Sequence, residues 1–320
     1  MELLSEISSR RVNRRRFLAG VGAAGAATVL AGCGNNGTAT MAAHTTAYGD
    51  ADILNFALNL EYLEAEFYLH AATGSGLATA DIGSNPGTVT GGAQVTGLTT
   101  AQQNILNEIA YDEQQHVRFL RSALGSAAVA RPAIDLTNSF NALAAAAGIG
   151  SSFNPFTNFN TFLVGAFIFE DVGVTAYSGA APLISVAGIA AGYLTAAAGI
   201  LAVEAYHAAY VRTVLTAGAI AQGTTAYPYL TYANQVSTLR ATLGGANETA
   251  LTVPAGTTSA TSIVTPSAIV AATTANAIAY ARTTDQVLHI VYGTAGSGAG
   301  VKSGAFFPSG LNGNISVTQS

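Results

Sequence analysis

The chain has 320 residues, of which 50% are hydrophobic and 9% are charged, and its mean hydropathy is +0.38. This length allows one large domain or two small ones, with ample apolar residues for a core. The net charge is −5, and without residues 1–32 the chain keeps 7 basic and 15 acidic residues, a balance of −8. So few basic residues disfavour a nucleic-acid partner.

The N-terminal residues have the pattern of an export signal. Residues 13–18 read Asn-Arg-Arg-Arg-Phe-Leu, and an apolar run rich in Ala and Gly extends from Phe17 to Gly32. A basic start, about sixteen apolar residues and a small-residue end are typical of a secretory signal and too short for a comfortable membrane span. The paired arginines resemble the twin-arginine export signal. We therefore expect residues 1–33 to direct the protein to the periplasm or cell envelope.

The only cysteine, Cys33, closes this segment. Leu30-Ala31-Gly32-Cys33 resembles the lipobox of bacterial lipoproteins, in which the cysteine is acylated and becomes the mature N-terminus. We expect lipidation of Cys33, with a membrane surface as the partner. An ordinary signal with an incidental cysteine and an uncleaved anchor helix are the alternatives. A single cysteine excludes an internal disulfide.

The mature chain is expected to be soluble apart from this anchor. Residues 34–50 are small and polar and predict a flexible tether. Outside the N-terminus we find no stretch of 18 apolar residues that is free of charge and of loop signals. Residues 180–203 are interrupted by Pro182 and several glycines and run directly into Glu204.

Helical spacing of apolar residues predicts an all-α four-helix bundle over residues 51–218. Its long helices are expected over residues 52–72, from Thr99 or Thr100 to 124, over 158–178, and from 184 or 190 to 217. Asp50 or Asp52 can cap the first helix, and Gly74 can end it. Residues 73–98 are a long Gly- and Thr-rich connection with room for a short hairpin, and residues 139–147 predict a short Ala-rich helix.

Residues 219–320 form an extension with weaker patterns. A short helix is expected over 228–243, loop or extended chain over 249–265, an additional helix over 267–292, and an irregular, glycine-rich tail over 293–320.

Two copies of one motif carry the chemical information. Glu113-Gln-Gln-His116 and Glu204-Ala-Tyr-His207 each place a carboxylate and an imidazole about one helical turn apart, on one face of an apolar helix. Such groups are costly to bury unless a partner compensates them, and a divalent metal commonly does so. One such pair is usually a solvated surface pair, but two copies indicate two metals. A structural site for a single metal and a relic that has lost its metal are the alternatives.

The other two long helices supply further carboxylates. Glu61 and Glu64 lie one turn apart on the same face, whereas Glu66 is five residues beyond Glu61, about 140° around the helix, and is placed outside the site. In the third helix we prefer Glu170 to Asp171, because its longer reach suits a bridging ligand. Glu64 is a ligand or a supporting group.

These residues resemble the ferritin-like superfamily, whose helix order of Glu, Glu-x-x-His, Glu, Glu-x-x-His is found over residues 51–218. Residues 60–68, 281–287 and 306–308 carry a narrower resemblance to the bacterial ferritin-like proteins grouped with desiccation-related proteins, over nearly the whole mature chain. The resemblance implies a dinuclear centre of two iron or two manganese ions. The expected metal ligands are Glu61, Glu113, His116, Glu170, Glu204 and His207.

Within this set we expect Glu61 and Glu204 to ligate one side together with His207 or His116, and Glu113 and Glu170 to bridge. Tyr68 and Tyr177, each seven residues after an expected ligand, are candidates for supporting hydrogen bonds. Other polar residues of the helices are expected on a solvent face, in ion pairs or in structural roles: Glu108, Asp112, Arg118, Arg121, His44, His70 and His289. Most of the remaining helix tyrosines are expected in the core: Tyr62, Tyr111, Tyr206 and Tyr210.

The leading functional hypothesis is an exported, lipid-anchored protein whose metal pair reacts with dioxygen or peroxide, as a ferroxidase-like or peroxide-consuming centre. The alternative is a non-catalytic envelope or desiccation-stress protein that uses the bundle as a scaffold. No catalytic residue is assigned, and an oligomer is left open. A storage cage is disfavoured, because the anchor and the C-terminal extension would obstruct shell assembly. The sequence contains no phosphate-binding loop, nucleophile elbow or zinc-protease motif.

Overall fold

In the computed structural model of the chain, residues 48–253, 276–294 and 298–320 are described. The remaining residues, 1–47, 254–275 and 295–297, lie outside this description. They include the predicted signal, Cys33, His44, most of the predicted tether and part of the predicted extension. Four long helices dominate: α3 (Asp50–Thr73), α4 (Thr100–Leu124), α6 (Phe159–Ala180) and α8 (Tyr193–Gln222). The shorter helices are α5 (Asn138–Ala147), α7 (Val186–Ala190), α9 (Tyr229–Gly244) and α10 (Thr284–Tyr292). The prediction of an all-α bundle with additional C-terminal helix and irregular tail is confirmed.

The helix ends follow local chemistry. At the start of α4, the Thr99 hydroxyl accepts from the backbone N–H of Gln102 at 3.2 Å, and the Gln102 side chain accepts from the N–H of Thr99 at 2.9 Å. In α3 the Asp52 carboxylate accepts from the N–H of Gly49. Gly74 ends the same helix at φ +80°, in the left-handed region where a side chain is strained.

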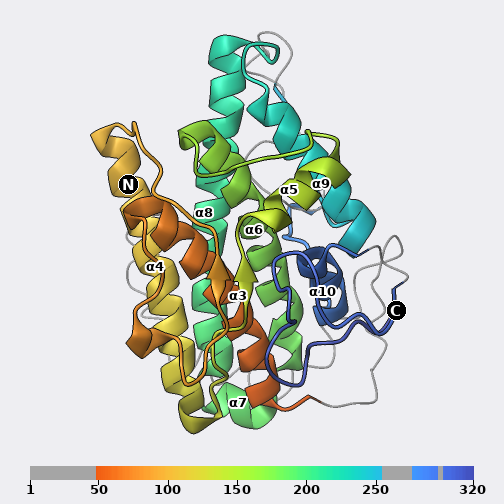
Figure 1. The fold of residues 1–320 in the computed structure, drawn as a ribbon. Helices are drawn as coiled ribbons and strands as arrows, with labels where there is room; N and C mark the ends of the chain where they lie inside the picture. The colour runs from red at the N-terminus through yellow and green to blue at the C-terminus, as the bar shows by residue number, and fades with distance from the viewer. Residues whose placement is uncertain (1–47, 254–275, 295–297) are drawn as a thin grey trace, which may run out of the picture. The chain divides into compact units, whose positions relative to one another are not determined.

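The long helices pack as two pairs, α3 with α4 and α6 with α8, and contacts of α3 with α6 and of α4 with α8 close the bundle. Figure 1 shows these four helices side by side, with α9 and α10 against α6. The bundle interior holds a dense aromatic cluster around Phe67, whose ring lies 5.2 Å from that of Phe169 and 5.8 Å from that of Phe140. This core holds the facing helices at a fixed separation.

The C-terminal tail is tied to the bundle. The side-chain amide of Asn59 in α3 donates to the carbonyl of Asn312 at 2.8 Å and accepts from its N–H at 2.9 Å. Phe306 is 1% exposed, and its ring lies 5.2 Å from Phe140 and 5.0 Å from Phe169. The extension is therefore part of the hydrophobic core, although its sequence pattern is weak.

Several details differ from the sequence-based expectations. The additional helix begins only at Thr284, after the Thr283 side chain has capped it, and residues 276–283 are not helical. The connection over 73–98 contributes no hairpin: β1 (Val89–Thr90) pairs in parallel with β2 (Ile134–Asp135). The chain before α8 forms the 3-10 turn η4 (Ala181–Leu183) and the separate helix α7, because Gly192 adopts φ +89° ahead of α8.

Two of the tyrosines expected in the core lie on the surface instead. Tyr111 is 60% exposed and Tyr206 is 76% exposed, since both lie on the outward faces of their helices. Tyr62 is buried as expected, and its hydroxyl donates to the carbonyl of Val129 at 3.1 Å.

Among the described residues, two helical segments are long and apolar enough to cross a membrane by length and composition alone, Phe159–Leu183 and Tyr193–Gln222. The sequence predicted no charge-free segment of this kind outside the N-terminus, and named residues 180–203 as a stretch that Pro182 and several glycines interrupt. In the structure that stretch is divided among η4, α7 and α8, and each of the two long segments contains charged residues. The bundle itself accounts for the first segment, because 83% of its apolar window is buried against neighbouring helices; in the second that share is 28%.

Candidate metal centre

The six expected ligands meet in the middle of the bundle, although they come from four helices. Glu61 lies on α3, Glu113 and His116 on α4, Glu170 on α6, and Glu204 and His207 on α8. All six are buried, and the least buried, His116, is 8% exposed. Each points inward because the apolar face of its helix must face the core, and the ligand shares that face.

Their ligand atoms form two groups, each within 4.8 Å. One contains Glu61, Glu113, His116 and Glu204, and the other contains Glu113, Glu170 and His207. Glu113 belongs to both, and its two oxygens face different imidazoles. Its Oε2 lies 3.3 Å from His116 Nδ1, and its Oε1 lies 3.0 Å from His207 Nδ1. A carboxylate placed between two such groups has the geometry of a bridging ligand.

The remaining distances complete the two groups. His116 Nδ1 lies 3.2 Å from Glu61 Oε2 and 3.6 Å from Glu204 Oε1. On the other side, His207 Nδ1 lies 3.7 Å from Glu170 Oε2. The structure thus places Glu204 with His116, and it places Glu170 in one group only, whereas the sequence suggested Glu170 as a second bridge.

Several ligand atoms in this cluster are buried without any hydrogen bond. They are Glu113 Oε1, Glu170 Oε2, both Glu204 carboxylate oxygens and His207 Nδ1. Although Glu113 Oε1 and His207 Nδ1 are only 3.0 Å apart, they do not meet in hydrogen-bond geometry. Buried polar atoms are normally paired, since an unpaired one costs about 1–3 kcal/mol. Orphaned acceptors that converge from three helices therefore fit a bound cation.

The electrostatics agree with this interpretation. Burial raises the pKa of Glu170 to about 8, and burial with the charges of neighbouring glutamates raises the pKa of Glu204 well above its usual range. Burial also raises the pKa of Glu61, against the effect of His116. Three carboxyls thus resist ionisation in this interior unless positive charge is brought to them.

Glu113 and the two histidines are shifted toward their charged forms instead. Burial acts against the charge of Glu113, but the adjacent imidazoles of His116 and His207 lower its pKa to about 2. Burial likewise opposes protonation of the imidazoles, yet Glu61 and Glu113 raise the pKa of His116 to about 11, and Glu170, Asp112 and Glu113 raise that of His207 to about 10. Without a metal, the protonated imidazoles of His116 and His207 are thus the positive charges that balance the carboxylates. Four ligating carboxylates would balance the charge of two divalent cations.

A glycine on α6 makes room for the cluster. A Cβ atom on Gly173 would lie 2.3 Å from Glu204 Oε2 and 3.4 Å from Glu64 Oε1. The first distance is far inside van der Waals contact, so any side chain at position 173 would displace the Glu204 carboxylate. Spacing of charged residues cannot reveal such a position, and the sequence reading missed it.

Hydrogen bonds from outside the six residues orient them. The Tyr68 hydroxyl donates to Glu170 Oε1, and the Tyr177 hydroxyl donates to Glu61 Oε1. Asp112 lies 3.2 Å from His207 Nε2, which leaves Nδ1 facing the carboxylates. Carboxylate–histidine pairs of this kind fix the ring orientation of metal-ligating histidines. The sequence suggested both tyrosines, but it assigned Asp112 only to a solvent face or an ion-pair network.

Glu64 lies beside the centre without joining either group. It is 5% exposed, and burial, followed by the charges of Glu113, Glu61 and Glu170, raises its pKa well above the usual range. The helical angle places Glu66 outside the site, and in the structure it is fully buried on another face, in an ion pair with Arg131. A charged residue excluded from the site thus has a structural partner in the core.

Asp171 also points away from the centre. Its Oδ2 accepts from Arg212 and from Arg240, each at 2.9 Å, and both arginines are buried. Arg240 in turn donates to Glu248 at 2.7 Å. The one-residue step from Glu170 to Asp171 turns the side chain about 100° around α6 and into this ion-pair network. The network fastens the C-terminal region to the bundle.

Comparison with known proteins agrees with the fold. A family model described as a ferritin-like domain matches residues 49–217. The chain is 31% identical over 279 residues to the ferritin-like catalase Nec2 of Nesocodon mauritianus, which covers 83% of this chain and 84% of that protein. It is also 31% identical over 208 residues to the desiccation-related protein PCC13-62 of Craterostigma plantagineum, over 61% of this chain and 62% of that protein.

Proposed function

This chain belongs to the ferritin-like family, and we propose that its buried carboxylate–histidine cluster binds two iron or two manganese ions and consumes hydrogen peroxide. The single observation that carries the proposal is the position of Glu113, whose two oxygens face two separate groups of ligand atoms. Carboxylate and imidazole donors suit iron and manganese, and no thiolate is available, since the only cysteine is Cys33.

The six ligands and their supporting residues would have separate roles in binding the two ions. Glu61, His116 and Glu204 would hold one ion, Glu170 and His207 the other, and Glu113 both. Tyr68, Tyr177 and Asp112 would keep the donors oriented, and the aromatic core around the site would exclude bulk water.

The bound pair would supply a two-electron redox couple. In the overall reaction one hydrogen peroxide is oxidised to dioxygen, a second is reduced, and two water molecules form, so electrons and protons balance without an external reductant. The catalase name of the relative from Nesocodon mauritianus favours this reaction over ferroxidase chemistry. Ferroxidase activity would in addition require ferrous iron as a substrate.

Metal content and peroxide consumption test the proposal together. We expect the natively purified or reconstituted chain to bind two ions and to release one dioxygen for every two peroxides consumed. The double variant Glu113→Ala/His116→Ala should lose both properties. Glu108→Ala is the matched control, because Glu108 lies exposed on the same helix, outside the site. Fewer than one bound ion per chain after reconstitution would refute the proposal.

A second candidate is a non-catalytic role in desiccation or envelope stress, with the bundle as scaffold. It is supported by the relative from Craterostigma plantagineum, whose name records a relation to desiccation. Under this function the Glu113→Ala/His116→Ala variant would still protect cells during drying, whereas under peroxide consumption the protection would disappear together with the metal.

We further propose export by the twin-arginine route and anchoring through acylated Cys33 to a membrane surface. The support is the N-terminal sequence alone. Cys33→Ser should release the protein from the membrane fraction into the soluble fraction, and Arg14→Lys/Arg15→Lys should retain it in the cytoplasm. Unchanged fractionation of both variants would contradict this proposal.

A further inference from the structure

We propose that a small cavity beside the metal centre holds hydrogen peroxide, with Glu64 as its hydrogen-bond acceptor and Phe306 of the C-terminal tail as the wall that excludes larger peroxides. The inference rests on the proposed function, because it names the substrate site of that same centre. It also assigns a role to the C-terminal extension.

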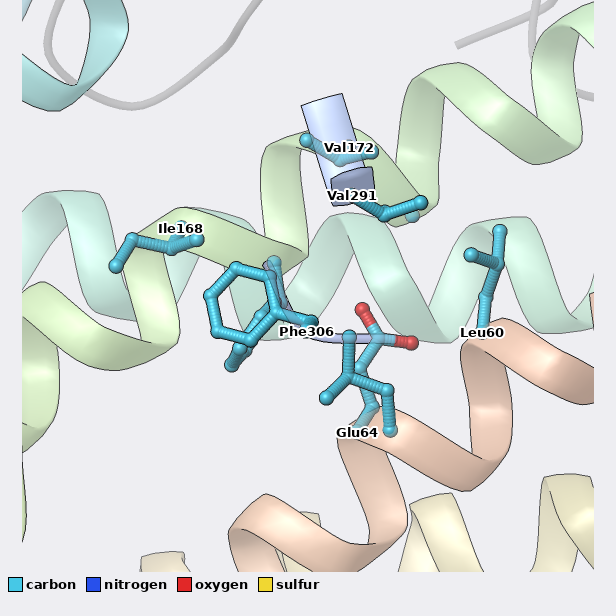
Figure 2. A pocket seen from close by; sticks show the side chains of 9 residues that line it. Leu60, Glu64, Ile168, Val172, Val291 and Phe306 are labelled. Carbon is cyan, nitrogen blue, oxygen red and sulfur yellow. The ribbon is translucent and has the colours of Figure 1, made fainter. Parts of the chain in front are cut away.

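The cavity lies between α3 and α6, and α10 and the C-terminal tail contribute one lining residue each. Its volume is about 20 Å³, enough for one molecule of about the size of water. It is lined by Leu60, Leu63, Glu64, Ile168, Phe169, Val172, Gly173, Val291 and Phe306. Figure 2 shows the Glu64 carboxylate among the apolar side chains of Leu60, Val291 and Phe306.

Glu64 is the one ionisable residue of this lining, and it belongs to neither group of candidate metal ligands. It is 5% exposed, and no hydrogen bond or ion pair joins it to another residue in the described part of the chain. A buried carboxyl group without a partner is costly, and a small hydroxyl donor in the cavity would satisfy it. Hydrogen peroxide has two O–H donors and is only one oxygen atom longer than the water molecule that this space admits. The apolar walls offer no competing acceptor.

The cavity and the metal centre share Gly173. This residue lines the cavity, and its missing Cβ would lie 3.4 Å from Glu64 Oε1 and 2.3 Å from Glu204 Oε2. The Glu64 and Glu204 carboxylates thus both approach the same point beside the Gly173 backbone. A molecule bound to Glu64 is therefore held one short step from a ligand of the metal pair, which raises its effective concentration there.

The walls opposite α3 come from the C-terminal extension. Val291 lies on α10, and the backbone N–H of Phe306 donates to the Val291 carbonyl at 3.2 Å. The Phe306 ring is fixed by its contacts with Phe140 and Phe169. Because packed rings leave no room for a branched alkyl group, the extension would act as a sieve that admits hydrogen peroxide and rejects alkyl hydroperoxides.

The first test measures selectivity in the metal-loaded full chain. In Phe306→Ala, kcat/KM for tert-butyl hydroperoxide relative to that for hydrogen peroxide should rise roughly tenfold or more. Phe140→Ala is the matched control, since Phe140 is equally buried and packs on Phe306 but does not line the cavity. Val291→Ala widens the cavity with a smaller loss of packing and serves if Phe306→Ala does not fold. An unchanged ratio in the folded variant, or an equal rise in Phe140→Ala, would overturn the proposal.

The second test measures binding without turnover. In the chain loaded with zinc, which has no redox chemistry, hydrogen peroxide should shift the infrared band of a buried carboxyl group. The shift should vanish in Glu64→Leu, which removes the acceptor, keeps a side chain of similar volume and is not oxidised by peroxide. In the iron- or manganese-loaded chain, Glu64→Leu should raise KM for hydrogen peroxide about tenfold or more, and Glu64→Gln, which keeps an acceptor oxygen, should keep KM close to that of the unmodified chain.

The two tests separate this inference from the proposed function. If the loaded chain consumes no peroxide but the zinc form shows the Glu64-dependent band shift, the proposed function fails and the cavity remains a peroxide site. If the loaded chain consumes peroxide and the zinc form shows no shift that depends on Glu64, the inference is wrong and the proposed function remains.

Discussion

Replacing Gly173 by alanine should weaken metal binding while leaving the fold intact. The new methyl group would lie 2.3 Å from Glu204 Oε2 and 3.1 Å from its Cδ, so the carboxylate must rotate out of the centre. Because the methyl group would clash with the carboxylate at the flexible end of the Glu204 side chain, neither α6 nor α8 need move. Alanine is favoured over glycine within a helix by about 1 kcal/mol, whereas overpacking costs about 1–3 kcal/mol. The unfolding free energy of the metal-free chain should therefore fall by no more than about 2 kcal/mol.

The main effect of Gly173→Ala should be a lower affinity for the metal. Misplacing one ligand or its support typically lowers metal affinity about 10–100-fold, which corresponds to roughly 1.4–2.7 kcal/mol. Competition of a chelator for bound Mn²⁺ measures the affinity, and thermal unfolding with and without Mn²⁺ gives the linked change in stability. Gly199→Ala is the matched control, because this glycine lies on α8 with open space around its Cβ position. If Gly173→Ala binds two ions with the affinity of the unmodified chain, the cradle assigned to this glycine is wrong.

Three further results are expected. Asp112→Asn should weaken metal binding about tenfold, because His207 loses the carboxylate that fixes its ring; isothermal titration with Mn²⁺ checks this, and unchanged affinity would contradict the role of Asp112. Glu66→Ala should lower the unfolding free energy by about 3–5 kcal/mol, since it leaves the mostly buried Arg131 side chain without its carboxylate partner, and denaturant unfolding should show this with two ions still bound. Metal binding should release protons and tighten as pH rises toward about 10. The carboxylates near His116 and His207 raise the imidazole pKa values to about 11 and about 10, and a ligating imidazole must be neutral. A weakly buffered titration that shows no proton release would count against ligation by these histidines.

The bundle and the candidate ligands were predictable because their signals are local. Apolar spacing, the caps at Thr99 and Gly74 and the Glu-x-x-His motifs each depend on residues within one or two helical turns. The angle between Glu61 and Glu66 likewise follows from the helix alone, and so does the separation of Glu170 from Asp171 on α6.

The sequence by itself thus determined where the four long helices lie and which six residues are candidate ligands that meet between them. Only the tertiary structure decided how Glu113 divides its oxygens between two imidazoles, why position 173 carries no side chain, and that Phe306 lines a cavity beside Glu64. The pairs Gly173 with Glu204, Glu113 with His207 and Glu64 with Phe306 lie 31, 94 and 242 positions apart in the chain. They arise when the helices and the tail pack to a common density, and helical periodicity carries no record of which neighbour fills a given gap.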